Sequence, residues 1–193
     1  MCTSSTLCCI RACARNNAGM ALLAEGILKL HWDQTVPVNI AHIVKQMGVR
    51  LQLQADLPCS AALSIDRNNQ AHLTLAQQLP HVHQRYVVAH ALAHVALHHL
   101  RPGMSQVIHI SEDFRLDFSL RHMREANDFA LRLLMPEPAL RYAVEAMQAR
   151  DANELAHTFA VPPLFVKQRM AELDLALARA VPRHLRGFTI ELD

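Results

Sequence analysis

The sequence predicts an α+β fold in which a small antiparallel sheet is packed by helices and followed by a helical C-terminal lobe. Apolar residues recur at helical spacing before Gly48, alternate with polar residues from Val49, and return to helical spacing from Arg85 onward. The chain has 193 residues, of which 51% are hydrophobic. A chain of this length buries a core without disulfides or structural metals, so we expect any metal to serve chemistry.

Charge and cysteine content narrow the class of protein. The net charge of +2 is too small to indicate general binding to nucleic acid or membranes, and there is no apolar run long enough for a spanning helix. The five cysteines are an odd number with four near the N-terminus, which argues against a disulfide framework. Because residues 1–14 also lack the pattern of a secretory signal, we expect a cytoplasmic protein. A zinc site among Cys2, Cys8, Cys9 and Cys13 lacks the usual paired spacing, and a loose N-terminal lead is the simpler interpretation.

Two amphipathic helices are expected before the sheet. The first follows Gly19, with apolar residues at positions 20, 23, 27 and 30. The second covers residues 40–47, where Asn39 can cap the start and Gly48 can adopt the left-handed conformation that ends a helix.

The sheet is expected to be a meander. Residues 49–54 alternate between apolar and polar, and the runs 61–65 and 71–75 flank a polar turn. From Arg85 the pattern is helical almost throughout, with breaks at residues 101–103, 136–138, 150–151 and 161–163.

Thirteen histidines invite a search for metal spacing. His90 and His94 are four residues apart on a predicted helix, so both imidazoles can reach one ion from the same face. In zinc peptidases the residue after the first histidine is a glutamate that acts as general base. Here that residue is Ala91. A histidine-rich helix can also produce such a pair by chance.

Glu125 is the candidate third ligand. It lies one helical turn before Phe129, at the edge of an apolar stripe that ends at Pro136. If this helix packs against the histidine helix, the carboxylate can point at the metal, and two histidines with one carboxylate form a hydrolytic zinc site. The alternative is an ordinary solvated glutamate.

These two segments resemble a known family. Tyr86 to His98 is similar, except at Ala91, to the HExxH helix of the ImmA/IrrE metallopeptidases, which are minimal zincins, and Glu125 to Pro136 is similar to their second hallmark. The resemblance covers most of residues 20–175. It implies a zincin-like domain over residues 19–149, after a lead over residues 1–18 and before a helical lobe over residues 150–193. It also implies that His90, His94 and Glu125 bind Zn²⁺ and that a general base belongs at position 91.

Ala91 is a departure from the family pattern. Loss of a general base typically lowers the rate 10²–10⁴-fold, so we expect the chain to be inactive as a peptidase. Zinc can still bind, because position 91 is not a ligand. Either a natural pseudopeptidase or a deliberate Glu-to-Ala replacement would give this sequence.

Two further side chains have both a functional and an ordinary interpretation. His98 is four residues beyond His94 and could be a fourth ligand or a proton shuttle, although a further turn of about 5–6 Å places it beyond the same ion. Cys59 precedes a predicted strand and could cap the zinc as a thiolate, or be an ordinary core or surface thiol.

Residues 153–170 have the spacing of a helix-turn-helix, with Lys167 and Arg169 as candidate phosphate contacts alongside Arg179, Arg183 and Arg186. The alternative is a packing or docking helix pair. The family resemblance implies that the protein substrate is a helix-turn-helix (XRE-type) transcriptional repressor, whose cleavage relieves repression in a stress response. A non-catalytic zinc protein that sequesters the repressor is the second hypothesis, and a DNA-binding regulator is the third.

Overall fold

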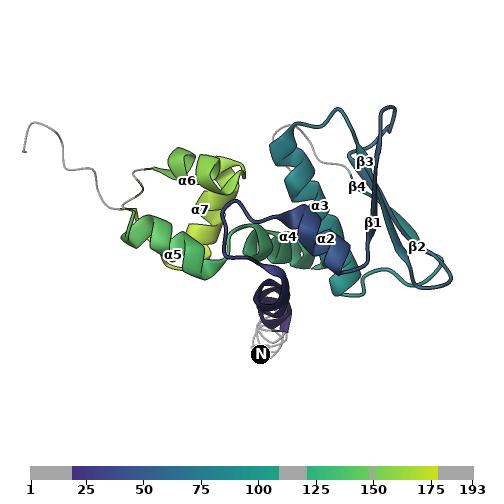
Figure 1. Cartoon of the computed structure of the whole chain (residues 1–193), viewed down its shortest axis with the longest axis horizontal. Helices are drawn as coiled ribbons and strands as arrows, with labels where there is room; N and C mark the ends of the chain where they lie inside the picture. The colour runs from purple at the N-terminus through teal and green to yellow at the C-terminus, as the bar shows by residue number, and fades with distance from the viewer. Residues whose placement is uncertain (1–18, 109–120, 148, 150, 178–193) are drawn as a thin grey trace, which may run out of the picture.

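The computed structural model describes residues 19–108, 121–147, 149 and 151–177, so the four N-terminal cysteines and Arg179, Arg183 and Arg186 lie outside the described residues. A helix over residues 19–31 comes first, followed by α2 (Ile40–Gln46) (Figure 1). As predicted, the Asn39 side chain accepts a hydrogen bond from the His42 amide at 3.1 Å, and Gly48 has a φ of 71° after the end of α2. Both helices that the sequence predicts here are therefore confirmed.

The sheet has four strands in the order β1-β3-β2-β4. The strands are β1 (Arg50–Gln54), β2 (Ala61–Ile65), β3 (Ala71–Ala76) and β4 (Ser105–Ile108). β2 pairs antiparallel with β3 and with β4, whereas β1 pairs parallel with β3. The predicted meander is wrong at β1, and the sheet is mixed rather than wholly antiparallel.

The predicted hairpin of β2 and β3 is present, and the turn between the two strands explains why. The Asp66 carboxylate accepts hydrogen bonds from the amides of Asn68 and Gln70, and Asn69 has a φ of 63°, so the chain reverses tightly. No such turn follows β1, and the chain crosses to the far side of β3 before it enters β2. β4 was not predicted, because four residues after a proline-glycine break carry little strand pattern.

Helix α3 (His81–Ala96) lies between the sheet and α4 (Arg121–Leu134) (Figure 1). All residues of α3 from Arg85 to His94 are buried, since the helix is covered on more than one side. The phenol of Tyr86 donates a 2.8 Å hydrogen bond to the side-chain oxygen of Asn127, which joins α3 to α4 inside the core. The two motifs that carry the family resemblance therefore pack against each other.

The C-terminal helices are α5 (Glu137–Glu145), α6 (Ala152–Phe159) and α7 (Pro163–Glu172). Asp151 caps α6, and Ala160 has a φ of 50° in the tight turn before α7, which confirms the predicted pair of short helices. The rings of Phe165 and Tyr86 are 4.5 Å apart, so α7 packs directly on the histidine helix. The predicted boundary at residue 149 falls between α5 and α6 and remains a prediction.

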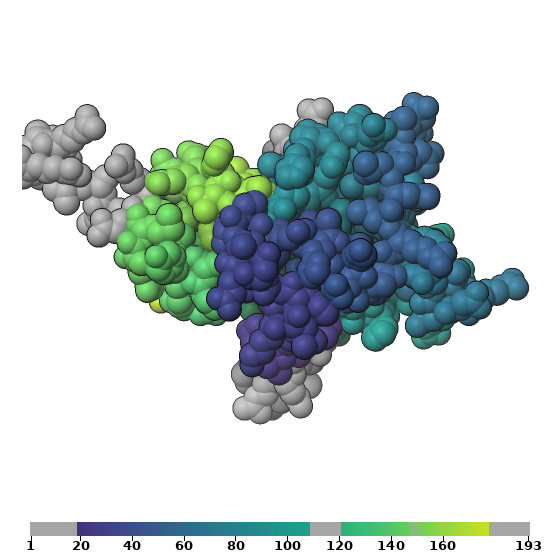
Figure 2. Space-filling model, viewed as in Figure 1, coloured from purple at the N-terminus to yellow at the C-terminus, as the bar shows by residue number. Residues whose placement is uncertain are grey.

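In the space-filling view, the C-terminal helices and the sheet lie at opposite ends of the molecule (Figure 2). The helix over residues 19–31 and α2 occupy the surface between them. Within the described ranges, none of the helices is both long enough and apolar enough to cross a membrane.

Candidate metal centre

His90 and His94 come together as the spacing predicts. Both side chains are fully buried on α3, and their Nε2 atoms are 3.2 Å apart. Two nitrogen ligands of a tetrahedral zinc ion, each at about 2.0–2.1 Å, lie about 3.3 Å from each other. The separation of these two nitrogens thus fits joint ligation of one ion.

The surroundings of His90 set its tautomer. Because the Tyr86 hydroxyl donates to Asn127, the phenolic oxygen is left as an acceptor for the Nδ1–H of His90, which is 3.5 Å away. The lone pair of the neutral imidazole then lies on Nε2, the nitrogen that faces His94. That is the nitrogen a metal requires.

His99, which was not singled out from the sequence, joins the cluster, whereas His98 does not. Helix α3 ends at Ala96, and His98 is exposed with a φ of 54°, so the spacing rule of a helix no longer applies to it. The reversal at His98 turns the next residue back, and the Nδ1 atoms of His99 and His94 are 3.1 Å apart. His98 therefore does not act with His94, and the prediction of a shared helix face is wrong.

Glu125 joins the histidines from α4, as expected, but through His99. Its Oε2 is 3.3 Å from Nε2 of His99, and its Oε1 accepts a 2.7 Å hydrogen bond from Nε of Arg121. A carboxylate acceptor places the proton of neutral His99 on Nε2, so its Nδ1 accepts from Nδ1–H of His94. His94 is then left with its own lone pair on Nε2.

This arrangement of protons directs two lone pairs at each other across 3.2 Å. Such a contact is repulsive unless a proton or a cation lies between the nitrogens. The donor set of the pair therefore fits a zinc ion. Glu125 contacts His99, which lies on the Nδ1 side of the His94 ring. Within the described ranges, however, no three histidine, cysteine, aspartate or glutamate side chains are already arranged to hold a metal.

The electrostatics keep the paired imidazoles neutral. Burial, followed by the nearby His99 and His122, lowers the pKa of His90 to about 4. Burial and the neighbouring histidines also lower the pKa of His94. His122, a second residue missed from the sequence, has its ring 5.9 Å from that of His94 and 5.7 Å from that of His99. Neutral imidazole is the form that binds metal.

Ala91 and Cys59 are the two other positions that the sequence singled out. Ala91 is fully buried, and α3 contains no acidic residue, so the metal helix supplies no carboxylate base. The thiol of Cys59 donates to the carbonyl of Ala61 at 3.4 Å, beside β2. This local contact agrees with the interpretation of Cys59 as an ordinary core or surface thiol.

The sequence matches the model of a protein family. The match is to the IrrE N-terminal-like domain, a peptidase domain, over residues 44–171. The chain belongs to this family. The match contains His90, His94 and Glu125 and extends through α6 and α7. The predicted resemblance and the α+β, zincin-like fold class are both confirmed.

A solved structure is also similar. The chain resembles a Mycobacterium tuberculosis transcriptional regulator with a TM-score of 0.61 and 21% sequence identity. The similarity covers 88% of this chain and 52% of the regulator, so the chain spans about half the length of that protein. At this identity the likeness shows the fold alone. No curated protein matches the sequence.

Proposed function

We propose that the chain is a zinc metallopeptidase scaffold, with His90, His94 and Glu125 as ligands, whose general base is absent at Ala91. The observation that carries this proposal is the convergence of two buried, neutral Nε2 atoms on the metal helix of a peptidase family. Glu125 is the third ligand in the proposal because of its place in the family pattern, and in the structure it lies near the pair through its contact with His99.

A bound zinc ion would polarise a scissile carbonyl and activate a water molecule. The residues of the chain orient that site. Tyr86 and Asn127 hold His90 in the tautomer with a free Nε2, and His99 with Glu125 does the same for His94. Helix α3 itself has no carboxylate that could accept a proton beside His90.

The proposed partner is a helix-turn-helix (XRE-type) repressor in the cytoplasm, cleaved by an active form to relieve repression in a stress response. The family and the transcriptional regulator that shares the fold both support a role in regulation. The fully buried Ala91 favours a second candidate, a pseudopeptidase that binds or sequesters the repressor without cutting it.

Direct DNA binding through α6 and α7 has less support than the sequence indicated. Arg169 is only 2% exposed, and its guanidinium donates to Glu172 at 2.6 Å and to the carbonyl of Met135 at 3.4 Å. A side chain this buried and paired does not reach the backbone of a DNA duplex at the surface of the helix pair. Lys167 is exposed, but one lysine is a weak footprint for nucleic acid.

Metal analysis of the purified chain tests the proposal. We expect one zinc per chain, and we expect the double variant His90→Ala, His94→Ala to lose it while His98→Ala keeps it. Retention of stoichiometric zinc by the double variant contradicts the site. Co-expression with a candidate repressor then tests the partner, and the proposal expects co-purification of the intact repressor.

A further inference from the structure

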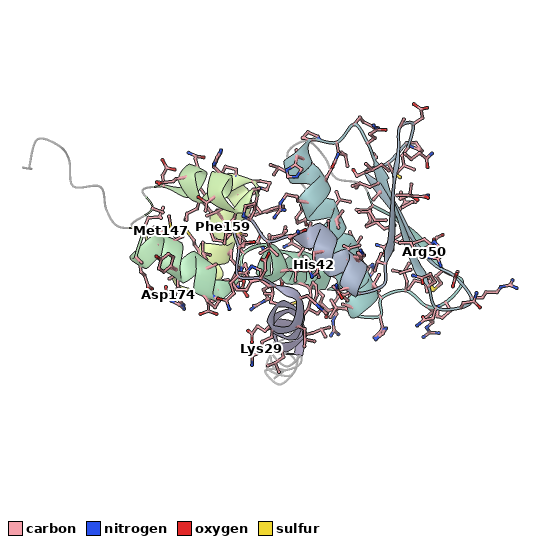
Figure 3. All side chains as sticks on the ribbon, viewed as in Figure 1. Lys29, His42, Arg50, Met147, Phe159 and Asp174 are labelled. Carbon is pink, nitrogen blue, oxygen red and sulfur yellow. The ribbon has the colours of Figure 1, made fainter. Side chains whose placement is uncertain are left out.

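A second, separate cavity lies among the helices. It is open to solvent, has a volume of about 780 Å³ and is lined by the helix over residues 19–31, its following turn, the end of α4, the start of α5, and α7. It shares no lining residue with the histidine cluster. Figure 3 labels Lys29, which contributes to the lining from the helix over residues 19–31. The volume lies in the range of small-molecule sites.

The lining has an excess of positive charge. Four cations, Lys29, Arg132, Arg141 and Arg169, face two carboxylates from Glu25 and Glu137. A third carboxylate, Glu172, pairs with both Arg132 and Arg169, so these two guanidiniums share one acid. Arg141 pairs with Glu137 at 2.7 Å and lies 3.8 Å from Glu145. Burial and the repulsion from Arg132 lower the pKa of Arg169 to about 10. A bound anion would relieve this repulsion.

Donors at the cavity are also incompletely used. Nε of Arg132 is buried and has no hydrogen-bond partner within the part of the chain that the structure describes. Beside it, α5 begins after Pro136 with no side-chain cap, and its first residues line the cavity. The positive end of this helix adds to the field of the guanidiniums.

The cavity also has apolar lining residues. Trp32, Leu22, Leu28 and two prolines line it, and the indole Nε1 donates a 2.8 Å hydrogen bond to the carbonyl of Thr35, which fixes the ring. We propose that this cavity binds a small organic anion, with its carboxylate or phosphate at Arg132, Arg141 and Arg169 and a planar apolar portion beside Trp32. Its site is independent of the proposed zinc centre.

The chain contains a single tryptophan, so Trp32 reports on this cavity alone. We would titrate the full chain with benzoate, adenosine monophosphate and inorganic phosphate at constant ionic strength, and follow the fluorescence. We expect a saturable change with benzoate or adenosine monophosphate, and weaker binding of inorganic phosphate, which lacks the planar portion. The two organic probes separate a carboxylate ligand from a phosphate ligand.

Matched arginine variants locate the binding. Arg132→Gln and Arg141→Gln should each weaken the dissociation constant at least about tenfold, whereas Arg67→Gln, in the exposed turn between β2 and β3, should not change it. Arg141 is partly exposed, so its variant should fold even if Arg132→Gln disturbs packing. Thermal melting checks this. Absence of saturation with either organic probe up to about 10 mM, or equal affinities in all four proteins, overturns the proposal.

Discussion

His99 links Glu125 to His94 of the candidate metal centre. Its ring touches His94 through Nδ1 and Glu125 through Nε2, so a single residue connects the carboxylate to a proposed ligand. A carboxylate can act on such a site in two ways: by binding the metal, or by orienting the imidazole that does. These two roles predict metal losses of different size.

Metal affinity separates the roles. If Glu125 is a ligand, Glu125→Gln should weaken zinc binding by more than about 100-fold, whereas His99→Ala, which removes only an orienting contact, should weaken it about 10–100-fold. Competition with a chromogenic chelator measures both constants. Equal, moderate losses in the two variants would show instead that Glu125 acts through His99.

The buried imidazoles also make stability depend on pH. An unfolded histidine titrates near 6.5, and burial lowers the pKa of His90 to about 4. Between these values the unfolded chain binds the extra proton, so the stability of the metal-free protein falls as pH drops from about 6.5 to about 4. The loss for His90 is about 3 kcal/mol.

Urea unfolding with a chelator at pH 7 and pH 5 measures the part of this loss that falls above pH 5, about 2 kcal/mol. His90→Gln should flatten the dependence, and His98→Gln, at an exposed position, should leave it unchanged. A free energy of unfolding that does not change between the two pH values contradicts the assigned burial of a neutral imidazole at position 90.

The residues found from sequence and those missed differ for a physical reason. His90 and His94 were predicted because helical spacing alone brings them together, and Glu125 was proposed because it lies at the edge of the apolar face of an amphipathic helix. His99 joins them only through the reversal at His98, which has a positive φ, and periodicity contains no information about such a turn. His122 depends on how α4 packs against α3, which is likewise a tertiary property.

Among the elements, helices were predicted better than strand partners. Each helix has its own apolar period and its own caps, as Asn39 and Asp151 show. β1 lies beside β3 rather than beside β2, the next strand in the chain. Its alternation of apolar and polar residues did not predict this partner, because all of β1 is exposed and even Leu53 is 58% exposed. Strand order depends on packing between strands, which the residue pattern of one strand does not contain.

The contact between α3 and α4 includes one buried hydrogen bond. Tyr86→Phe removes the donor to Asn127 and leaves a buried amide oxygen without it, so the free energy of unfolding should fall by about 1–3 kcal/mol. Tyr142→Phe is the matched control, because that side chain is 63% exposed. Urea unfolding of both variants gives the difference. Equal stabilities would mean that the hydrogen bond does not hold the helices together.

At the scale of the whole molecule, the candidate centre lies where separate parts of the chain meet. Helix α3 packs against the sheet, against α4 and, through the contact of Tyr86 with Phe165, against α7. The C-terminal helices therefore support the histidine helix, in keeping with a family match that runs from residue 44 to residue 171. Within the proposed function, position 91 is the point at which the metal helix departs from the family pattern.

Ala91→Glu tests whether that one residue separates the chain from an active peptidase. Because Ala91 is fully buried, the new carboxylate costs stability unless it reaches the zinc-bound water that the proposal places beside His90. We expect the zinc-loaded variant to cleave the repressor that the unchanged chain binds intact, with a gain of about 10²–10⁴-fold. Cleavage is followed by mass spectrometry of the fragments.

Ala93→Glu, at another buried alanine of the same helix, is the control for a new carboxylate without the correct position. It should lower the melting temperature without producing cleavage. Melting and zinc content must show that Ala91→Glu is folded and loaded. If that folded, loaded variant binds the repressor and still cuts nothing, the chain differs from an active peptidase at more than position 91. The sequestering pseudopeptidase then becomes the function that the structure supports.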